Sequence, residues 1–367
     1  MQTLDRNGYT AAQVRAALHA PNCRISFRYE LLNATNQFKA PLKTVTDASV
    51  SLNTESEIKR TARFTLLDDG SVNFVSDRIK PYARVGIGSA WAEFPLGVFL
   101  LSTPTKRASP TGIVTRDIEA YDQLQVLKDD KITGKYLIAT GTNYITAIKT
   151  ILDGAGIVSQ NLTASTSALP VDREWEAATP KLTIINELLA ALNYDALFFD
   201  EEGVAVARPY VTPDVRASEY TYADDSQSVM FPEVEETLDL FNVPNQFVLV
   251  VSQPDRGVLK SVYTNAEPTS PTSTVSRSRT IVDYRQVDAP DQVTLDSLAR
   301  TAAFRASQVY QSVTFDTAIM PQHSHNDVLT LQFSKLGLDA KYEEVGWSMQ
   351  LKATAKMRHT IRRVVTV

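Results

Sequence analysis

Two histidines and an aspartate form the pattern in this sequence that most resembles a metal-binding motif. His323, His325 and Asp327 occupy alternate positions of one segment. In a β-strand such positions point to the same side, and imidazole and carboxylate groups are ligands that zinc accepts. However, the polar run from Gln322 to Asp327 follows Pro321, which predicts a turn between two strands, and no second cluster supplies further ligands. We therefore expect neither a metal nor a cofactor, and keep these three residues as the metal candidates.

Other residues with reactive side chains lack partners at useful spacings. His19 and His359 are isolated in the sequence, and we expect them at the surface. Cys23, the one cysteine, lies in an alternating pattern that predicts a strand, so a small buried hydrophobe is favoured over a reactive thiol. Adjacent carboxylates such as Glu235 and Glu236 would point to opposite faces of a strand. Because hydrolase elbows, zinc-protease motifs and phosphate loops are also absent, we predict no catalytic residue and no enzyme.

The elements around the histidine cluster are a predicted helix and several strands. Apolar residues recur at spacings of three and four and predict an amphipathic helix over 294–311, with Thr294 as its N-cap. Its stripe is rich in alanine, so a partner could approach closely. The alternation of apolar residues from Val345 to Met357 predicts one long strand that extends to a neighbouring subunit. The predicted subunit-interface residues are Ala299, Ala302, Ala306, Val345, Trp347 and Met349.

The bulk composition is that of a folded protein with two or three domains. The chain has 367 residues, of which 43% are hydrophobic and 22% charged. A net charge of −5 argues against a dedicated nucleic-acid-binding protein. We expect no secretory signal and no membrane-spanning segment, because no apolar run approaches about 20 residues. The basic C-terminal residues lack interleaved aromatic rings, so we interpret them as a solvated face or a surface for an acidic partner.

Strand and helix patterns divide the chain into four predicted regions. The fold class that they indicate is β-rich α+β, with two small antiparallel tube-like β-barrels and an α+β domain between them. The predicted regions are an N-terminal arm with a short helix (1–20), a first barrel (21–120), an α+β insert (121–213), and a second barrel that contains the long helix (214–367).

The order of these elements resembles the baseplate-hub or tail-tip hub proteins of tailed bacteriophages. The family's usual glycine before the turn aspartate is replaced here by Asn326, which also tolerates tight turns. The resemblance covers nearly the whole chain and lies in the order of the elements and in their residue patterns. The segments that carry it are Glu119–Lys131, Tyr144–Gly156, Asn193-Tyr194, Asp200–Gly203, Phe231–Asn245, Leu295–Tyr310 and Pro321–Val328.

The resemblance implies a structural virion protein at the distal end of the tail, made in the cytoplasm of the bacterial host. It implies a homotrimer whose six barrels match a hexameric tail tube above and narrow to a three-fold spike or fibre below. The implied partners are a tail tube or distal tail protein and a central spike, fibre or tape-measure protein, with DNA only in transit during genome ejection. Because DNA must slide, we expect a channel wall without strong positive charge and basic C-terminal residues that face away from it. Many such proteins carry a C-terminal hydrolase or receptor-binding extension, which we expect to be absent after Val367 or to sit on another chain.

Two alternatives come from other functional classes. A host-surface carbohydrate-binding or adhesin module could use Trp91, Trp175 and Trp347 as stacking platforms, and would be favoured by two exposed tryptophans in one groove. A cell-wall hydrolase would be favoured by two carboxylates that converge in a cleft.

Overall fold

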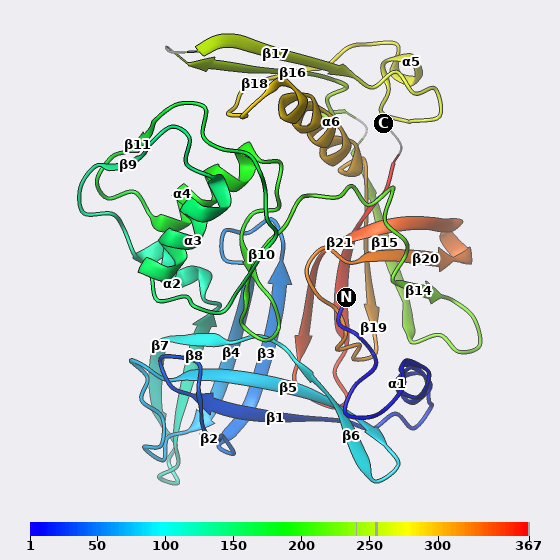
Figure 1. Ribbon diagram of the computed structural model, residues 1–367. Helices are drawn as coiled ribbons and strands as arrows, with labels where there is room; N and C mark the ends of the chain where they lie inside the picture. The colour runs from blue at the N-terminus through cyan, green and yellow to red at the C-terminus, as the bar shows by residue number, and fades with distance from the viewer. Residues whose placement is uncertain (240, 254–255, 366–367) are drawn as a thin grey trace.

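The computed structural model describes residues 1–239, 241–253 and 256–365. About 42% of the chain is strand and 17% is helix, so the predicted β-rich character is confirmed. Leu240 in the predicted entry to the second barrel, and Val367 at its end, lie outside the described residues. Figure 1 shows a large assembly of strands, a lobe of helices beside it, and a small layer of strands at one end.

One sheet of 14 strands runs through both regions that the sequence assigns to barrels. Its main path is β15-β19-β22-β21-β3-β4-β8-β7-β5-β1-β2. The two regions join where β3 (Val45–Asn53) pairs antiparallel with β21 (Leu338–Gln350). The described residues form no closed barrel, and the two-barrel arrangement stays a prediction. The other strands of this sheet are β1 (Ile25–Leu32), β2 (Phe38–Pro41), β4 (Arg60–Leu67), β5 (Arg78–Ile87), β6 (Ala90–Pro95), β7 (Phe99–Ala108), β8 (Val114–Tyr121), β14 (Tyr220–Ala223), β15 (Met230–Leu238), β19 (Gln311–Thr317), β20 (Val328–Phe333) and β22 (Met357–Arg363).

Alternation along these strands separates a core face from a polar face. In β4, Ala62, Phe64 and Leu66 are buried, while the residues between them are not. The buried residues of the N-terminal and C-terminal strands belong to one hydrophobic cluster, which includes both Phe64 and Phe315. The two β regions therefore share a single core. Helix α1 (Ala11–Leu18) packs on this unit. Thr10 and Gln13 stand at the spacing that predicts a capping box at its start, and this capping box is present.

The segment between the two β regions forms a helical lobe with its own core. Its apolar contacts come mainly from α3 and α4, which pack against each other, and the Asn143 side chain caps α3. The helices are α2 (Leu124–Asp129), α3 (Tyr144–Gly154) and α4 (Lys181–Ala191). The strands are β9 (Tyr136–Ile138), β10 (Gln160–Leu162), β11 (Arg173–Trp175), β12 (Phe198–Phe199) and β13 (Ala205–Ala207).

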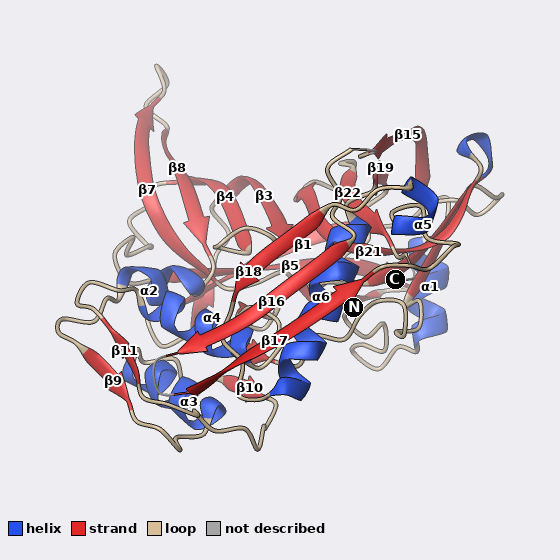
Figure 2. Cartoon of the chain, turned by 90° about the horizontal axis from the view of Figure 1, so that it is seen from above, coloured by secondary structure: helices blue, strands red, loops and turns tan. Residues whose placement is uncertain are grey.

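A third unit interrupts the C-terminal β region. It is a sheet in the order β17-β16-β18, formed by β16 (Gln246–Gln253), β17 (Arg256–Thr264) and β18 (Val282–Gln286). Figure 2 shows this sheet lying over α6 (Gln292–Gln308), and the two share a small core. The helix predicted over 294–311 is α6, which begins at Gln292 and ends at Gln308. It begins earlier than predicted because Asp291 rather than Thr294 accepts the capping hydrogen bond.

Two further predictions are wrong in detail. The single long strand from Val345 to Met357 is two strands, because β21 ends at Gln350 and a turn leads back into β22. The segment between Asn265 and Arg279, whose Pro, Ser and Thr content predicts a long loop without regular structure, contains the short helix α5 (Thr274–Arg277). A 3-10 turn, η1 (Ser334–Leu336), connects β20 to β21. None of the helices in the described ranges combines the length and apolar character that crossing a membrane requires.

Candidate functional site

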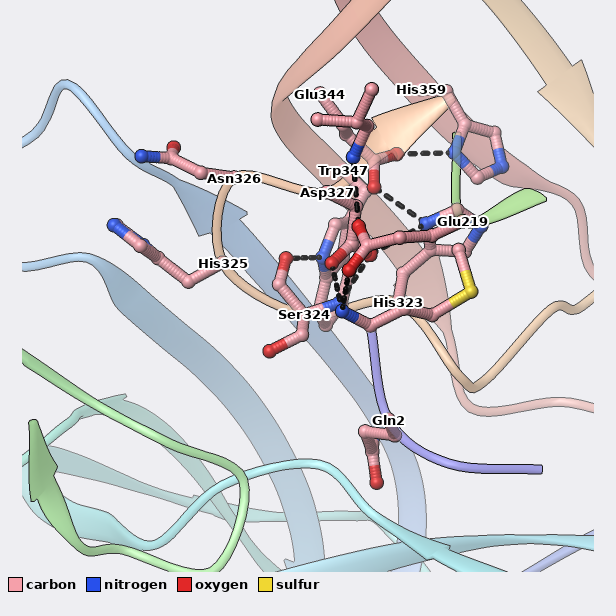
Figure 3. Close-up of polar contacts among 12 residues, drawn as sticks. Gln2, Glu219, His323, Ser324, His325, Asn326, Asp327, Glu344, Trp347 and His359 are labelled. Carbon is pink, nitrogen blue, oxygen red and sulfur yellow. Dashed lines mark hydrogen bonds and ion pairs between the residues drawn. The ribbon is translucent and has the colours of Figure 1, made fainter. Parts of the chain in front are cut away.

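The loop between β19 and β20 carries the predicted metal candidates, and it sends their side chains in two directions. His323 and Asp327 point into a buried cluster, while His325 and Asn326 lie on the other side of the loop (Figure 3). The ring of His325 stacks on Phe198 of the helical lobe, with centroids 4.0 Å apart. Two of the three predicted candidates, His323 and Asp327, therefore lie in the same cluster, and the third, His325, lies in a different environment.

Glu344 of β21 is the centre of the buried cluster. One carboxylate oxygen accepts a hydrogen bond from Nδ1 of His323 at 2.5 Å, and the other accepts from Nδ1 of His359 at 2.6 Å. The second nitrogens of the two rings lie 2.6 Å from the Tyr222 hydroxyl and 2.8 Å from the Thr317 hydroxyl. These five side chains, from Glu344, the two histidines, Tyr222 and Thr317, are all buried. Both carboxylate oxygens of Glu344 and both nitrogens of each histidine ring have a hydrogen-bond partner.

Asp327 connects this cluster to the start of the chain. Its carboxylate lies 2.6 Å from the Met1 amine and 3.3 Å from Nδ1 of His323, and it accepts a hydrogen bond from the Ser324 backbone at 2.8 Å. The Met1 amine also contacts Glu219 at 3.2 Å. These contacts hold the N-terminal segment against the loop, as Figure 3 shows.

The charges of the cluster balance one another. Burial alone would lower the pKa of His323, but the carboxylates of Glu344 and Asp327 outweigh it and raise this pKa to about 9. Burial disfavours charge on both carboxyl groups too, yet the cationic partners hold the pKa of Asp327 and that of Glu344 below their ordinary values. Burial keeps the pKa of His359 below its ordinary value, because Glu344 compensates it only in part. At neutral pH the cluster therefore contains a charged His323 and a neutral His359.

The distances fit a hydrogen-bonded network better than a metal cage. The ligand atoms of His323, Glu344 and His359 lie within 4.8 Å of one another. Tetrahedral zinc ligands at about 2.1 Å from the ion are roughly 3.4 Å apart, whereas the carboxylate oxygens here lie 2.5 Å and 2.6 Å from the ring nitrogens. An ion would have to break both hydrogen bonds and push the groups apart. We therefore interpret the cluster as structural, a polar anchor for the loop and the N-terminal segment.

Sequence reasoning missed the two remaining members of the cluster. His359 was expected at the surface, but it is buried in β22, where Met357, His359 and Ile361 alternate with exposed or half-exposed residues. That alternation was a readable signal. Glu344 carried no comparable signal, because its neighbour Glu343 is also buried and only the fold places the two on opposite sides of β21.

Two other predictions of side-chain environment need correction. His19 is half-buried, and its ring nitrogens lie 2.5 Å from the Tyr220 hydroxyl and 2.8 Å from the Gln227 carbonyl oxygen. Cys23 precedes β1 and is half-buried rather than enclosed in a strand.

The predicted interface residues are mostly used inside the chain. Ala299 belongs to the core under β16, and Trp347 and Met349 belong to the core of the large sheet. Val345 is also buried, while Ala302 and Ala306 are half-buried and line a cavity beside α6. Their role between subunits stays a prediction, and Ala302 and Ala306 are the members that a partner could reach.

The three tryptophans do not form a stacking platform. Trp175 and Trp347 are buried. Trp91 is half-buried, and the guanidinium groups of Arg24 and Arg84 lie 5.3 Å and 4.8 Å from its ring centroid. The observation that would favour the carbohydrate-binding alternative is therefore missing from these three residues.

Comparison with solved structures identifies the fold. A tail protein from Neisseria meningitidis MC58 matches with a TM-score of 0.65 and 11% identity, over 92% of this chain and 97% of that one. The 43 kDa tail protein of prophage MuSo2 from Shewanella oneidensis matches with a TM-score of 0.63 and 11% identity, over 92% and 98% of the two chains. The prophage tail protein gp18 from Listeria monocytogenes matches with a TM-score of 0.52 and 12% identity, over 91% and 94%.

These similarities are confined to structure. No protein-family model matches the sequence, and no curated protein matches it. The matched regions cover nearly the whole length of the solved structures and nearly all of this chain. The resemblance to phage tail proteins that the sequence suggested is therefore confirmed as a shared fold.

Proposed function

We propose that this protein is a structural component of a phage tail, a baseplate or tail-tip hub that lines the DNA channel. On this proposal three copies form a ring, join the six-fold tail tube to a three-fold spike or fibre, and work at the distal end of the tail. The shared fold with three prophage or bacterial tail proteins supports a tail role. The observation that supports the channel role most directly is the polar face of the large sheet.

This polar face crosses the junction between the two β regions. In the register of the sheet, Ser348 of β21 lies beside Ser51 of β3, which lies beside Thr61 of β4, which lies beside Tyr121 of β8. On the other side of Ser348 comes Arg358 of β22. Figure 2 shows β7, β8, β4 and β3 following one another along one side of the molecule. The face is therefore continuous across the junction rather than two separate patches, with the short hydroxyl side chains of Ser348, Ser51 and Thr61 between Arg358 and Tyr121.

The charges on this face are of both signs, and several of them form ion pairs. Arg63 of β4 pairs with Glu119 of β8 at 3.4 Å, and Lys356 lies 3.7 Å from Asp316 of β19. A wall of this kind binds no row of phosphates, so DNA could slide along it without releasing many counterions. Arg358 is an exposed member of the face, so on this proposal the expectation that every basic C-terminal residue faces away from the channel does not hold for Arg358.

The cell-wall hydrolase alternative is supported by one observation, but the two carboxyl groups concerned do not form an accessible site. Asp195 and Glu343 line one cavity, and burial raises the pKa of each. Both side chains are buried, Asp195 contacts Arg208 at 3.3 Å, and Glu343 accepts a hydrogen bond from Gln308 at 2.9 Å. A glycan strand needs an open cleft with both carboxyl groups on its bond. The geometry favours the structural role.

The experiment that tests this proposal is the mass of the purified protein, by native mass spectrometry and sedimentation, followed by imaging. The chain mass is 40.6 kDa, and we expect a species of three times that mass with a central hole. A monomer at every concentration, also after mixing with the tail-tube protein of the same phage, would contradict the hub. A mixture that forms rings only with the tube protein would support the hub and assign assembly to the partner.

A further inference from the structure

The side of the β19–β20 loop that carries His325 and Asn326 faces a polar cavity. The large sheet, the helical lobe and the unit formed by α6 and its small sheet meet at this cavity. Its volume is about 490 Å³. The helical lobe contributes Asp195 and Tyr210, α6 contributes Arg305, the loop contributes His325, and β21 contributes Glu343. Segments that are far apart in the sequence therefore build one cavity. Two of the elements that contribute to it, α6 and β21, are labelled in Figure 1.

Three buried polar groups of the cavity lining have no hydrogen-bond partner. They are Oε1 of Glu343, the hydroxyl of Tyr210 and Nδ1 of His325. Glu343 and His325 are 5% exposed, and Tyr210 is 9% exposed. An unsatisfied polar group in such a place destabilises the fold, so native proteins usually provide a partner for it. Three unsatisfied groups in the lining of one cavity indicate that a polar ligand completes it.

The other charged groups of the cavity already have partners within the chain. Their contacts are Arg362 with Glu55 at 2.5 Å, Arg285 with Asp283 at 2.5 Å, Arg305 with Asp195 at 3.8 Å, and Lys59 with the Thr54 carbonyl oxygen at 2.6 Å. Lys59 and Glu343 contact neutral groups alone, but Glu343 differs from the other carboxylates of the lining, because Glu55 and Asp195 each have an arginine partner and no cation lies within ion-pair distance of Glu343 among the described residues. The group that the cavity lacks is therefore a cation for Glu343.

We propose that this cavity binds a nitrogen cation, a primary ammonium or guanidinium group, with Glu343 as its counter-ion and Tyr210 as a second acceptor. Such groups carry several N–H donors and no acceptor, which matches a carboxylate oxygen and a hydroxyl that both lack a donor. His325 is neutral, because burial and nearby cations keep its pKa well below its ordinary value, so it does not repel the cation.

A metal ion fits this cavity less well. Among the described residues, the one group of three metal-ligating side chains within mutual reach is His323, Glu344 and His359, on the opposite side of the loop. The ammonium could come from a free di- or polyamine or from a lysine of a second copy of this chain. The two sources share their chemistry and are separated by the experiment.

The test uses the full-length protein and titrates it with 1,4-diaminobutane and with methylguanidinium chloride, monitored by calorimetry and by the melting temperature. Sodium chloride at matched ionic strength is the salt control. We expect saturable binding that weakens by about tenfold or more in Glu343→Gln and also weakens in Tyr210→Phe. Asp339→Asn, an exposed carboxylate on the same strand, is the matched control and should bind as the unmodified protein does.

The possible outcomes distinguish a free amine from a lysine of a second copy, and they include results that overturn the proposal. Saturable amine binding by a protein of unchanged mass assigns the site to a free amine. Self-association that is lost in Glu343→Gln and competed by the amine assigns it to a lysine of a second copy. A melting temperature that responds to the amine and to sodium chloride alike, or binding that is equal in Glu343→Gln and Asp339→Asn, overturns the proposal. The proposed tail function is unaffected by that result.

Discussion

Replacing Glu344 by glutamine should destabilise the large sheet far more than the same change at the adjacent Glu343. Glu344 accepts hydrogen bonds from His323 and His359 and carries the charge opposite the protonated His323. A glutamine amide can accept from one ring but would turn its own N–H₂ group toward the other. The variant therefore loses a charge-assisted hydrogen bond and leaves His323 buried with its more distant partner, Asp327 at 3.3 Å.

The magnitude follows from these two losses. A hydrogen bond to a charged group contributes about 1.5–3 kcal/mol, and breaking a buried ion pair by removing one partner costs about 3–5 kcal/mol. We expect Glu344→Gln to lower the free energy of unfolding by about 3 kcal/mol or more. Glu343→Gln keeps the contact with Gln308 and removes a buried charge that has no cation, so we expect a change within about 1 kcal/mol.

The assay is urea unfolding at pH 7, monitored by the fluorescence of Trp347. Its indole donates to the Ser324 carbonyl oxygen at 3.4 Å, so it reports on the loop that the network holds. The background would carry phenylalanine at Trp91 and Trp175, so that one indole is observed. If Glu344→Gln unfolds at the same urea concentration as Glu343→Gln, the reasoning about the network is refuted.

Three further predictions test other parts of the account. Because the pKa of His323 is raised from 6.5 to about 9, its contribution to the free energy of unfolding is complete below pH 6.5 and is lost as the pH rises through 9. The Met1 amine, whose pKa is also raised, acts in the same direction. Urea titrations should therefore show a free energy of unfolding that falls by about 3 kcal/mol between pH 6.5 and pH 9. Gly203→Ala should lower the melting temperature more than Gly141→Ala, because both glycines have positive φ but only at Gly203 would the new methyl lie 2.8 Å from Val98, in the segment between β6 and β7. Suspensions of bacterial cell wall should keep their turbidity with the protein, and clearing that disappears in Glu343→Gln would contradict the non-enzymatic role.

The sequence predicts local structure well where one face of an element meets one core. The capping box that Thr10 and Gln13 predict is present, because it depends on contacts within three residues. The helix over 294–311 was displaced by a few residues, since Asp291 competes with Thr294 as the cap and propensity does not decide between them. The alternation of apolar residues in the sequence likewise matches the buried faces of β4 and β19.

What the sequence could not predict is the pairing between distant segments. The joining of β3 to β21 depends on residues almost 300 positions apart, and no local pattern encodes it. The same holds for the site, where Glu344 and His359 come from strands outside the loop that carries His323. The third unit was also missed, because the apolar run from Phe247 to Val251 reads equally well as a barrel strand.

The measurement that tests the central proposal most directly is an electron cryo-microscopy reconstruction of the purified protein, alone and with the tail-tube protein of the same phage. The account predicts a three-fold ring in which Ser51, Thr61 and Ser348 of the large sheet line the central hole. A ring that turns this polar face outward, or an assembly of another symmetry, would contradict it.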